Sequence, residues 1–202
     1  YAFSSFKNNS RPVNNVNVQF TGLNNVFITT EMVNKLLILS KEKPYFLNKE
    51  DIDLRELEFS LESNEMIKSA QVYLTVNSTV MARVEQRVPI ARVQNSEVFY
   101  IDDEGLRMPL STQHSARVPM VYGIVEEDDL QRIYKLALTA YNDSFFKTYL
   151  TGIYLNKNKE ISLKLRLLDF HILIGNLDKL ELKFKNLKAF YQKAKKDNML
   201  DI

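Results

Sequence analysis

The segment from Met66 to Val88 places the strongest constraint on how this chain can fold. Apolar residues alternate with polar residues on both sides of a short polar turn, Asn77-Ser78-Thr79. A period of two places every second side chain on the same face of a strand, so the two halves are predicted to pair as a hairpin with one apolar face. The residues of that face are Ala70, Val72, Leu74, Val76, Val80, Ala82 and Val84.

One strand and two helices are predicted ahead of the hairpin. The strand alternates apolar and polar residues up to Gly22. Thr30 is predicted to cap the first helix, and Asp53, followed by Glu56, is predicted to cap the second. The order strand, helix, helix, strand, strand suffices for a small domain whose helices cover one face of a sheet. The apolar residues of these elements are Val16, Val18 and Phe20, then Val33, Leu36 and Leu37, then Leu54, Leu57 and Leu61.

Pro89 marks the end of the hairpin and the start of a second domain, because proline has no amide hydrogen for a strand ladder. Short strands are predicted after it, joined by a turn at Gly105. Residues 127–150 are predicted to be helical, residues 152–175 to form three more strands, and a lysine-rich helix to follow. The predicted fold class is α+β, with a flexible segment over residues 1–13, a first domain over 14–88, and a second domain over 89–202 with a mainly antiparallel sheet and helices.

The charge balance argues against nucleic acid as a partner. The 202 residues include 27 basic and 25 acidic ones, a net charge of +2, whereas binding to a phosphate backbone depends on a clear positive excess. The chain has no cysteine, which excludes a disulfide scaffold, a thiol nucleophile and a zinc–thiolate site. No apolar run reaches the length of about 18 residues that a membrane span requires.

The residues that could carry chemistry have simpler structural explanations. Neither His114 nor His171 has a repeated spacing of acidic residues or cysteines around it that would indicate metal ligands. The acidic clusters at 102–104 and 126–129 precede a turn glycine and a helix, where turn formation and the helix dipole account for them. The five glycines are scattered and no G-x-S-x-G motif occurs. We therefore predict no catalytic residue, no metal site and no cofactor.

Several stretches, in this order, resemble the extracytoplasmic part of the bacterial cell-division family FtsQ, called DivIB in Gram-positive bacteria. "MIKSAQVYLTVNSTVMARVEQRVPIARV" is similar to its recurrent hairpin and proline, "FYIDDEGLRMPL" to its aspartate–glycine hairpin, and "HILIGNLDKLELKFKNLKAFY" to its late strand and lysine-rich helix. The resemblance implies that the first domain is a POTRA module and the second the family's β domain. It also implies a non-enzymatic divisome scaffold that binds FtsB- and FtsL-type partners (DivIC and FtsL in Gram-positive bacteria) and helps control septal peptidoglycan synthesis.

The resemblance further implies a location and a binding surface. Family members have a single membrane span upstream, which places this region in the periplasm or on the extracellular face of the cytoplasmic membrane. In the family, FtsB docks by strand addition on a last strand that follows the final helix; we expect this chain to lack that strand. The residues beside it are then expected to bind the partner: His171, Ile172, Leu173, Ile174 and Gly175 of the preceding strand, and Phe184, Lys188, Tyr191 and Lys195 of the helix.

Two alternative functions stay open, as does the role of the lysines on the final helix. A POTRA-containing factor for outer-membrane protein assembly or secretion would carry several POTRA repeats and a downstream barrel. A small α+β ligand-binding enzyme would have a deep apolar pocket with converging polar groups near His171. The lysines are explained either by solvation or by attraction to an acidic partner or to anionic lipid.

Overall fold

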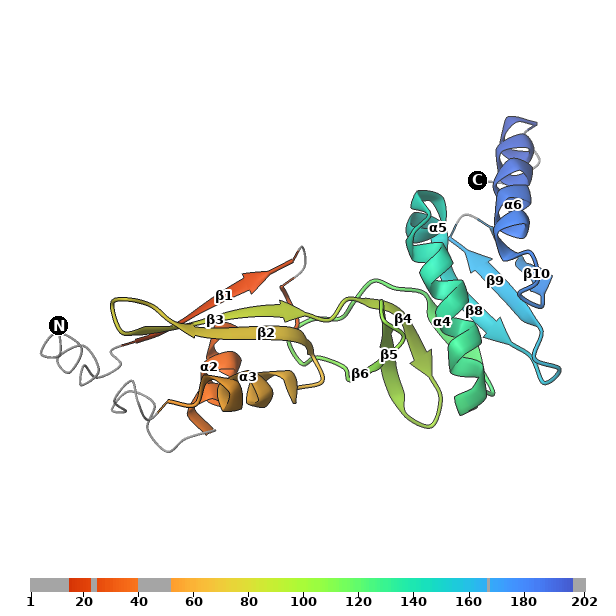
Figure 1. Cartoon of the computed structure of the whole chain (residues 1–202). Helices are drawn as coiled ribbons and strands as arrows, with labels where there is room; N and C mark the ends of the chain where they lie inside the picture. Colours follow the sequence, from red (N-terminus) through yellow and green to blue (C-terminus); the bar gives the residue numbers. More distant parts are fainter. Residues whose placement is uncertain (1–14, 23–24, 40–51, 167, 198–202) are drawn as a thin grey trace, which may run out of the picture. The chain divides into compact units, whose positions relative to one another are not determined.

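The protein is described by a computed structural model, and its chain divides into two units (Figure 1). The first unit comprises Tyr1–Arg87 together with the short segment Ser111–Ser115, and the second comprises Val88–Leu110 and Ala116–Ile202. The predicted flexible segment, residues 1–13, lies outside the described residues. The structure describes residues 15–22, 25–39, 52–166 and 168–197.

The first unit is a three-stranded sheet with two helices on one side of it (Figure 1). The central strand is β3 (Thr79–Gln86), which pairs in parallel with β1 (Asn15–Thr21) and antiparallel with β2 (Ile67–Leu74). The helices are α2 (Thr30–Leu39) and α3 (Leu54–Glu62). The element order is therefore the predicted strand, helix, helix, strand, strand.

Side-chain caps fix where the two helices begin. The Asp53 carboxylate accepts hydrogen bonds from the backbone N–H groups of the second and third residues of α3, at 3.0 and 3.1 Å, as predicted. The cap of α2 is Thr29 rather than the predicted Thr30, because the Thr29 hydroxyl accepts from the Met32 N–H at 3.3 Å. Two adjacent threonines satisfy the same sequence pattern, so the pattern could not tell which hydroxyl faces the first turn.

The apolar face of the hairpin forms the core of the first unit with the two helices. All of its predicted residues pack in this core except Val76. Val76 is exposed because β2 ends at Leu74 and Val76 lies in the turn. The buried residues are Ile28, Val33, Leu37, Leu57, Leu61, Ile67, Ala70, Val72, Val80, Ala82 and Val84.

Two sets of contacts, one from Gln86 and one from the segment Ser111–Ser115, fix the loop that precedes α2. The buried Gln86 side chain accepts from the N–H groups of Phe27 and Ile28, at 3.0 and 3.3 Å, and donates to the Ile28 carbonyl at 3.0 Å. The segment Ser111–Ser115 contributes the second set: the Ser111 hydroxyl donates to the Phe27 carbonyl at 2.8 Å, and the His114 ring packs edge-on against the Phe27 ring. These contacts give His114 a structural role.

The second unit contains a seven-stranded sheet in the order β10-β9-β8-β7-β4-β5-β6. β7 pairs in parallel with both β4 and β8, and the other neighbouring pairs are antiparallel, so the sheet is mainly antiparallel as predicted. β7 itself was not predicted, because four residues are too few to show an alternation. The strands are β4 (Pro89–Gln94), β5 (Val98–Asp102), β6 (Arg107–Met108), β7 (Met120–Gly123), β8 (Leu150–Leu155), β9 (Ile161–Leu165) and β10 (His171–Gly175).

Three helices, α4 (Glu127–Tyr141), α5 (Ser144–Tyr149) and α6 (Leu180–Lys196), cover one face of this sheet. The stretch predicted as helical, 127–150, is interrupted between α4 and α5. Asp143 causes the break, since its carboxylate accepts from two N–H groups of the next turn, at 3.0 and 3.3 Å, and starts a new helix. The apolar stripe of α6 is buried as the sequence pattern indicates, through Leu180, Phe184, Leu187, Tyr191 and Ala194.

Both acidic clusters have structural roles. In the β5–β6 turn, the Asp102 carboxylate accepts from the N–H groups of Glu104 and Leu106, at 3.0 and 2.7 Å. At the start of α4, the buried Asp129 carboxylate accepts from the Glu126 N–H at 3.0 Å and from the Lys159 ammonium at 2.6 Å. The second cluster therefore ties the turn between β8 and β9 to α4.

Asp129 makes the stability of the second unit depend on pH. Burial would raise the pKa of Asp129, but hydrogen bonds from Lys159 and the Glu126 N–H lower it below its ordinary value. A lowered pKa means that the stabilisation is present above the ordinary pKa and is lost as the pH falls through the folded-state pKa, below about pH 4. We expect Lys159→Met to lower the free energy of unfolding at pH 7 and to make its decline with falling pH shallower in urea unfolding between pH 7 and pH 2.5, because the pKa of Asp129 then lies closer to its unfolded value or above it. Lys157→Met, in the same turn, is the control and should leave the profile unchanged; equal profiles for both variants would contradict this role of Asp129.

Gly123 occupies a position where no side chain fits. Its φ is +114°, and a Cβ atom there would lie 2.0 Å from the carbonyl oxygen of Leu155. We expect Gly123→Ala to lower the free energy of unfolding by about 2 kcal/mol or more, since both the backbone strain and the clash have to be relieved. Gly175→Ala is the matched control: φ is +67°, but nothing lies within 4 Å of the added Cβ. Thermal unfolding should show the larger loss for Gly123→Ala, and the reverse order would refute the steric argument.

Candidate partner-binding surface

Strand β10 lies at one end of the seven-stranded sheet and is paired on one side only. Its partner is β9, with His171 opposite Lys164, Ile172 opposite Leu163 and Leu173 opposite Ser162. Among the described residues, no strand lies on its other side. An edge strand presents backbone N–H and C=O groups to whatever lies beside it, so β10 can pair with an added strand.

The side chains of β10 alternate between the two faces of the sheet. Ile172 and Ile174 pack against the helix-covered core. His171 and Leu173 point to the other face, where Leu173 is 66% exposed. The His171 ring stacks on Tyr154 with a centroid distance of 4.3 Å, and Tyr154 stacks on Tyr122 at 4.9 Å. The edge therefore presents one exposed leucine and the end of an aromatic row.

A side chain from α6 closes the C-terminal end of this edge. The Lys183 ammonium donates to the backbone carbonyls of Ile174 and Asn176, both at 2.9 Å, and to the Asn176 side-chain oxygen at 3.0 Å. The Ile174 carbonyl thus already has a charged donor, which makes it a poor acceptor for a new strand. The part of β10 suited to strand pairing is His171–Leu173.

Two of the residues predicted to bind a partner do not lie on the surface. Phe184 and Tyr191 are only 3% and 6% exposed. The Phe184 ring stacks on Phe146 at 3.9 Å, and the Tyr191 ring lies 5.1 Å from that of Phe145. Both belong to the buried stripe of α6, so they position the helix and offer no surface for contact in this conformation.

The two predicted lysines lie on the outside of α6. Lys195 is exposed, whereas Lys188 is half-buried and forms an ion pair with the carboxylate of Asp143. Burial would raise the pKa of Asp143, but hydrogen bonds from Lys188 and from the first turn of α5 lower it below its ordinary value. Lys188 thus joins α6 to α5, and its charge is already partly balanced. Contact of any of these residues with a partner stays a prediction.

The outer face of α6 carries two apolar side chains that the sequence analysis did not select. Leu182 and Phe190 are each 51% exposed. Both fall outside the buried stripe when the helix is drawn at 100° per residue, so the periodicity that identified the stripe also contained this signal. Exposed lysines surround them, namely Lys185, Lys193 and Lys196.

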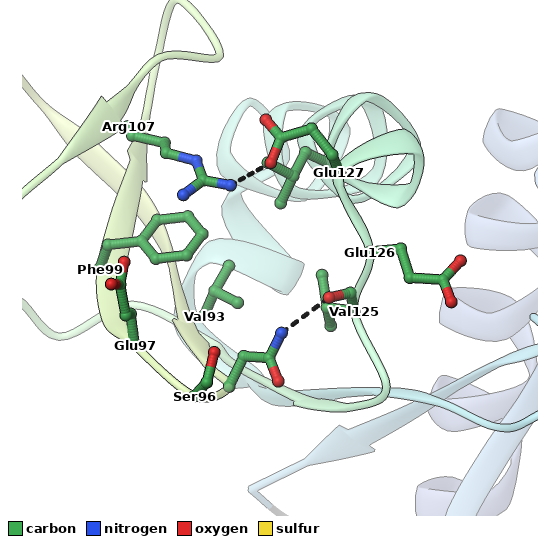
Figure 2. A pocket seen from close by; sticks show the side chains of 10 residues that line it. Val93, Ser96, Glu97, Phe99, Arg107, Val125, Glu126 and Glu127 are labelled. Atoms are coloured by element: carbon green, nitrogen blue, oxygen red, sulfur yellow. Dashed lines mark hydrogen bonds and ion pairs between the residues drawn. The ribbon is translucent and has the colours of Figure 1, made fainter.

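A small polar hollow of about 200 Å³ lies between the β4–β5 turn and the start of α4 (Figure 2). The Asn95 side chain donates to the Val125 carbonyl at 2.7 Å. Arg107 pairs with Glu127 and lies over the Phe99 ring, 4.5 Å from its centroid. These contacts join strands β4 to β6 and their turns to the start of α4. His171 does not line the hollow.

The described residues contain no group of three or more histidine, cysteine, aspartate or glutamate side chains that could hold a metal ion. Within the same residues, no helix has both the length and the apolar character needed to cross a membrane.

Two family models match this chain. Residues 88–202, more than half of the chain, match the model described as FtsQ/DivIB, C-terminal related. Residues 13–85 match the model of a POTRA-like domain. No curated protein matches the chain.

The contact of Lys183 with the end of β10 leads to a measurable expectation. Lys183→Met removes a donor to three oxygen atoms but keeps an apolar stem of similar length. We expect amide hydrogen exchange near Ile174 and Asn176 to rise by about tenfold, as local opening becomes easier. Lys185→Met, on the exposed side of the same helix, is the control and should not change it. Unchanged exchange in Lys183→Met would show that Lys183 does not hold the end of the strand.

Proposed function

Because the chain belongs to the FtsQ/DivIB family of cell-division proteins, we propose that it is a non-enzymatic scaffold that binds FtsB- and FtsL-type partners at the septum. Through these partners it helps to control septal peptidoglycan synthesis. The observation that carries the proposal is the FtsQ/DivIB match over residues 88–202 in a unit whose sheet ends at an edge strand. A scaffold of this kind needs an exposed pairing edge and no reacting group.

The proposed mode of capture is strand addition beside β10. Backbone groups of His171–Leu173 supply hydrogen bonds that do not depend on the partner's sequence. Selectivity then rests on side chains, chiefly Leu173, which is exposed and can be covered by a partner residue. Lys195 and the other exposed lysines of α6 favour an acidic partner segment by long-range attraction.

The proposal includes a place in the cell. The FtsQ/DivIB family is membrane-anchored with an extracellular domain. We place this chain on the outer face of the cytoplasmic membrane, in the periplasm or facing the exterior, joined to a single membrane span upstream.

The alternative functions receive no support from the described residues. An outer-membrane assembly factor would share the POTRA-like domain but gives no reason for an FtsQ/DivIB match over the rest of the chain. An enzyme built around His171 would need that side chain in a pocket, whereas its ring lies exposed at the sheet edge against Tyr154.

Substitution of Leu173 tests the binding mode. We expect Leu173→Asp to raise the Kd for the FtsB–FtsL-type complex of the same organism at least about tenfold, because a charge replaces the apolar contact at the pairing edge. The thermal unfolding midpoint should change little, since the side chain is already exposed. Binding would be measured by biolayer interferometry with the full-length protein.

Val76→Asp provides the matched control, because Val76 is also exposed but lies in the turn between β2 and β3 of the first unit. Its Kd should equal that of the unmodified protein. Wild-type affinity in Leu173→Asp, or an equal loss in both variants, would rule out β10 as the docking edge.

A further inference from the structure

The first unit also has a sheet edge, and that edge is occupied. Among the described residues, β2 pairs only with β3, so alternate backbone groups of β2 point away from that pairing. Two of these outward groups already have acceptors. The Ala70 N–H donates to the Glu62 carboxylate at 3.1 Å, and the Val72 N–H donates to the Glu58 carboxylate at 2.8 Å. We call Glu58 and Glu62 the carboxylate pair.

The spacing of helix and strand explains how one helix reaches two amides. Glu58 and Glu62 are four residues apart on α3, which is about 6 Å along a helix axis. Ala70 and Val72 are two residues apart on β2, which is about 6.8 Å along a strand. The distance between the two glutamates on the helix therefore nearly equals the distance between the two amides on the strand. Glu58 accepts from Val72 and Glu62 accepts from Ala70, so α3 runs antiparallel to β2. The two carboxylates take the place of the carbonyl acceptors that a neighbouring strand would supply.

Apolar contacts with the core also hold α3 in this position. Leu57 and Leu61, on the adjoining side of α3, are buried among the apolar residues of β2 and β3. The glutamates are therefore available to satisfy backbone groups, and a change in them removes hydrogen bonds without removing the helix. Hydrogen bonds from N–H groups to ionised carboxylates are stronger than those between neutral groups, which makes this pair an effective cover.

We propose that Glu58 and Glu62 close the β2 edge to strand addition, and that their removal turns β2 into a self-association edge. The occupant of the opened edge is β2 of a second copy of this chain, because an antiparallel pair of identical strands about a two-fold axis satisfies both edges at once. Phe59, exposed on α3 between the two glutamates, adds apolar surface of the kind that accompanies edge-to-edge association. This inference rests on the first unit alone and does not depend on the proposed function.

The test compares two double variants of the whole chain. In Glu58→Ala/Glu62→Ala, both acceptors are lost; in Glu58→Gln/Glu62→Gln, the side-chain oxygens remain but the charges are lost. We expect amide exchange at Ala70 and Val72, measured by NMR, to be about tenfold faster in the alanine variant and intermediate in the glutamine variant, whose neutral acceptors form weaker hydrogen bonds. Amides of the central strand, at Ala82 and Val84, report whether the fold is intact.

The same samples show whether the edge has opened to a second copy. By size-exclusion chromatography with light scattering, the alanine variant should form a concentration-dependent dimer that the wild type, the glutamine variant and the charge control Glu65→Ala do not form. If the double alanine variant does not fold, the single variant Glu62→Ala is measured in its place. In it, amide exchange should become faster at Ala70 but stay slow at Val72. Wild-type exchange at both amides would overturn the proposal. Faster exchange in the alanine variant without formation of a dimer would show that the two glutamates do not prevent self-association through β2.

Discussion

Backbone hydrogen bonding along the outer strands is the constraint on which both units depend. The alternation of apolar residues decides which side chains face the core, and the pairing with the inner strand decides which amides point outward. At β2, carboxylates from α3 accept from outward N–H groups; at the end of β10, the Lys183 ammonium donates to the Ile174 carbonyl. In both units, a charged side chain from a helix therefore satisfies backbone groups of an outer strand.

Much of this architecture could be predicted from local patterns. The hairpin depends on a repeat of two residues, the buried stripe of α6 on a repeat of 3.6 residues, and the Asp53 cap on the glutamate three residues after it. The structure confirms all three. Errors arose where the deciding interaction is short or distant. The sequence alone could not separate Thr29 from Thr30, did not show that Asp143 starts a new helix, and gave no sign of β7, whose two parallel pairings join segments far apart in the chain.

At the candidate site too, local patterns predicted some features, and contacts between distant elements decided the others. An apolar run was enough to identify residues 171–175 as a strand, but its place at the end of the sheet depends on the pairing of all the other strands. The resemblance predicts Phe184 and Tyr191 as partner-binding residues on the helix beside that strand, although their own periodicity places them in the core. Lys183 and the glutamates of α3 could be identified in the sequence only as charges on helices. Their role follows from backbone groups on another element, which no local pattern records.

The segment Ser111–Ser115 has a consequence for how this chain can be divided. The polypeptide leaves the first unit at Arg87, returns for five residues, and leaves again, so the first unit is not a continuous stretch of sequence. A fragment that ends before Pro89 would lack the Ser111 hydroxyl and the His114 ring that hold Phe27. The first unit therefore cannot be transplanted intact by a single cut, and a chimera of two family members would need to carry the returning segment from the same parent.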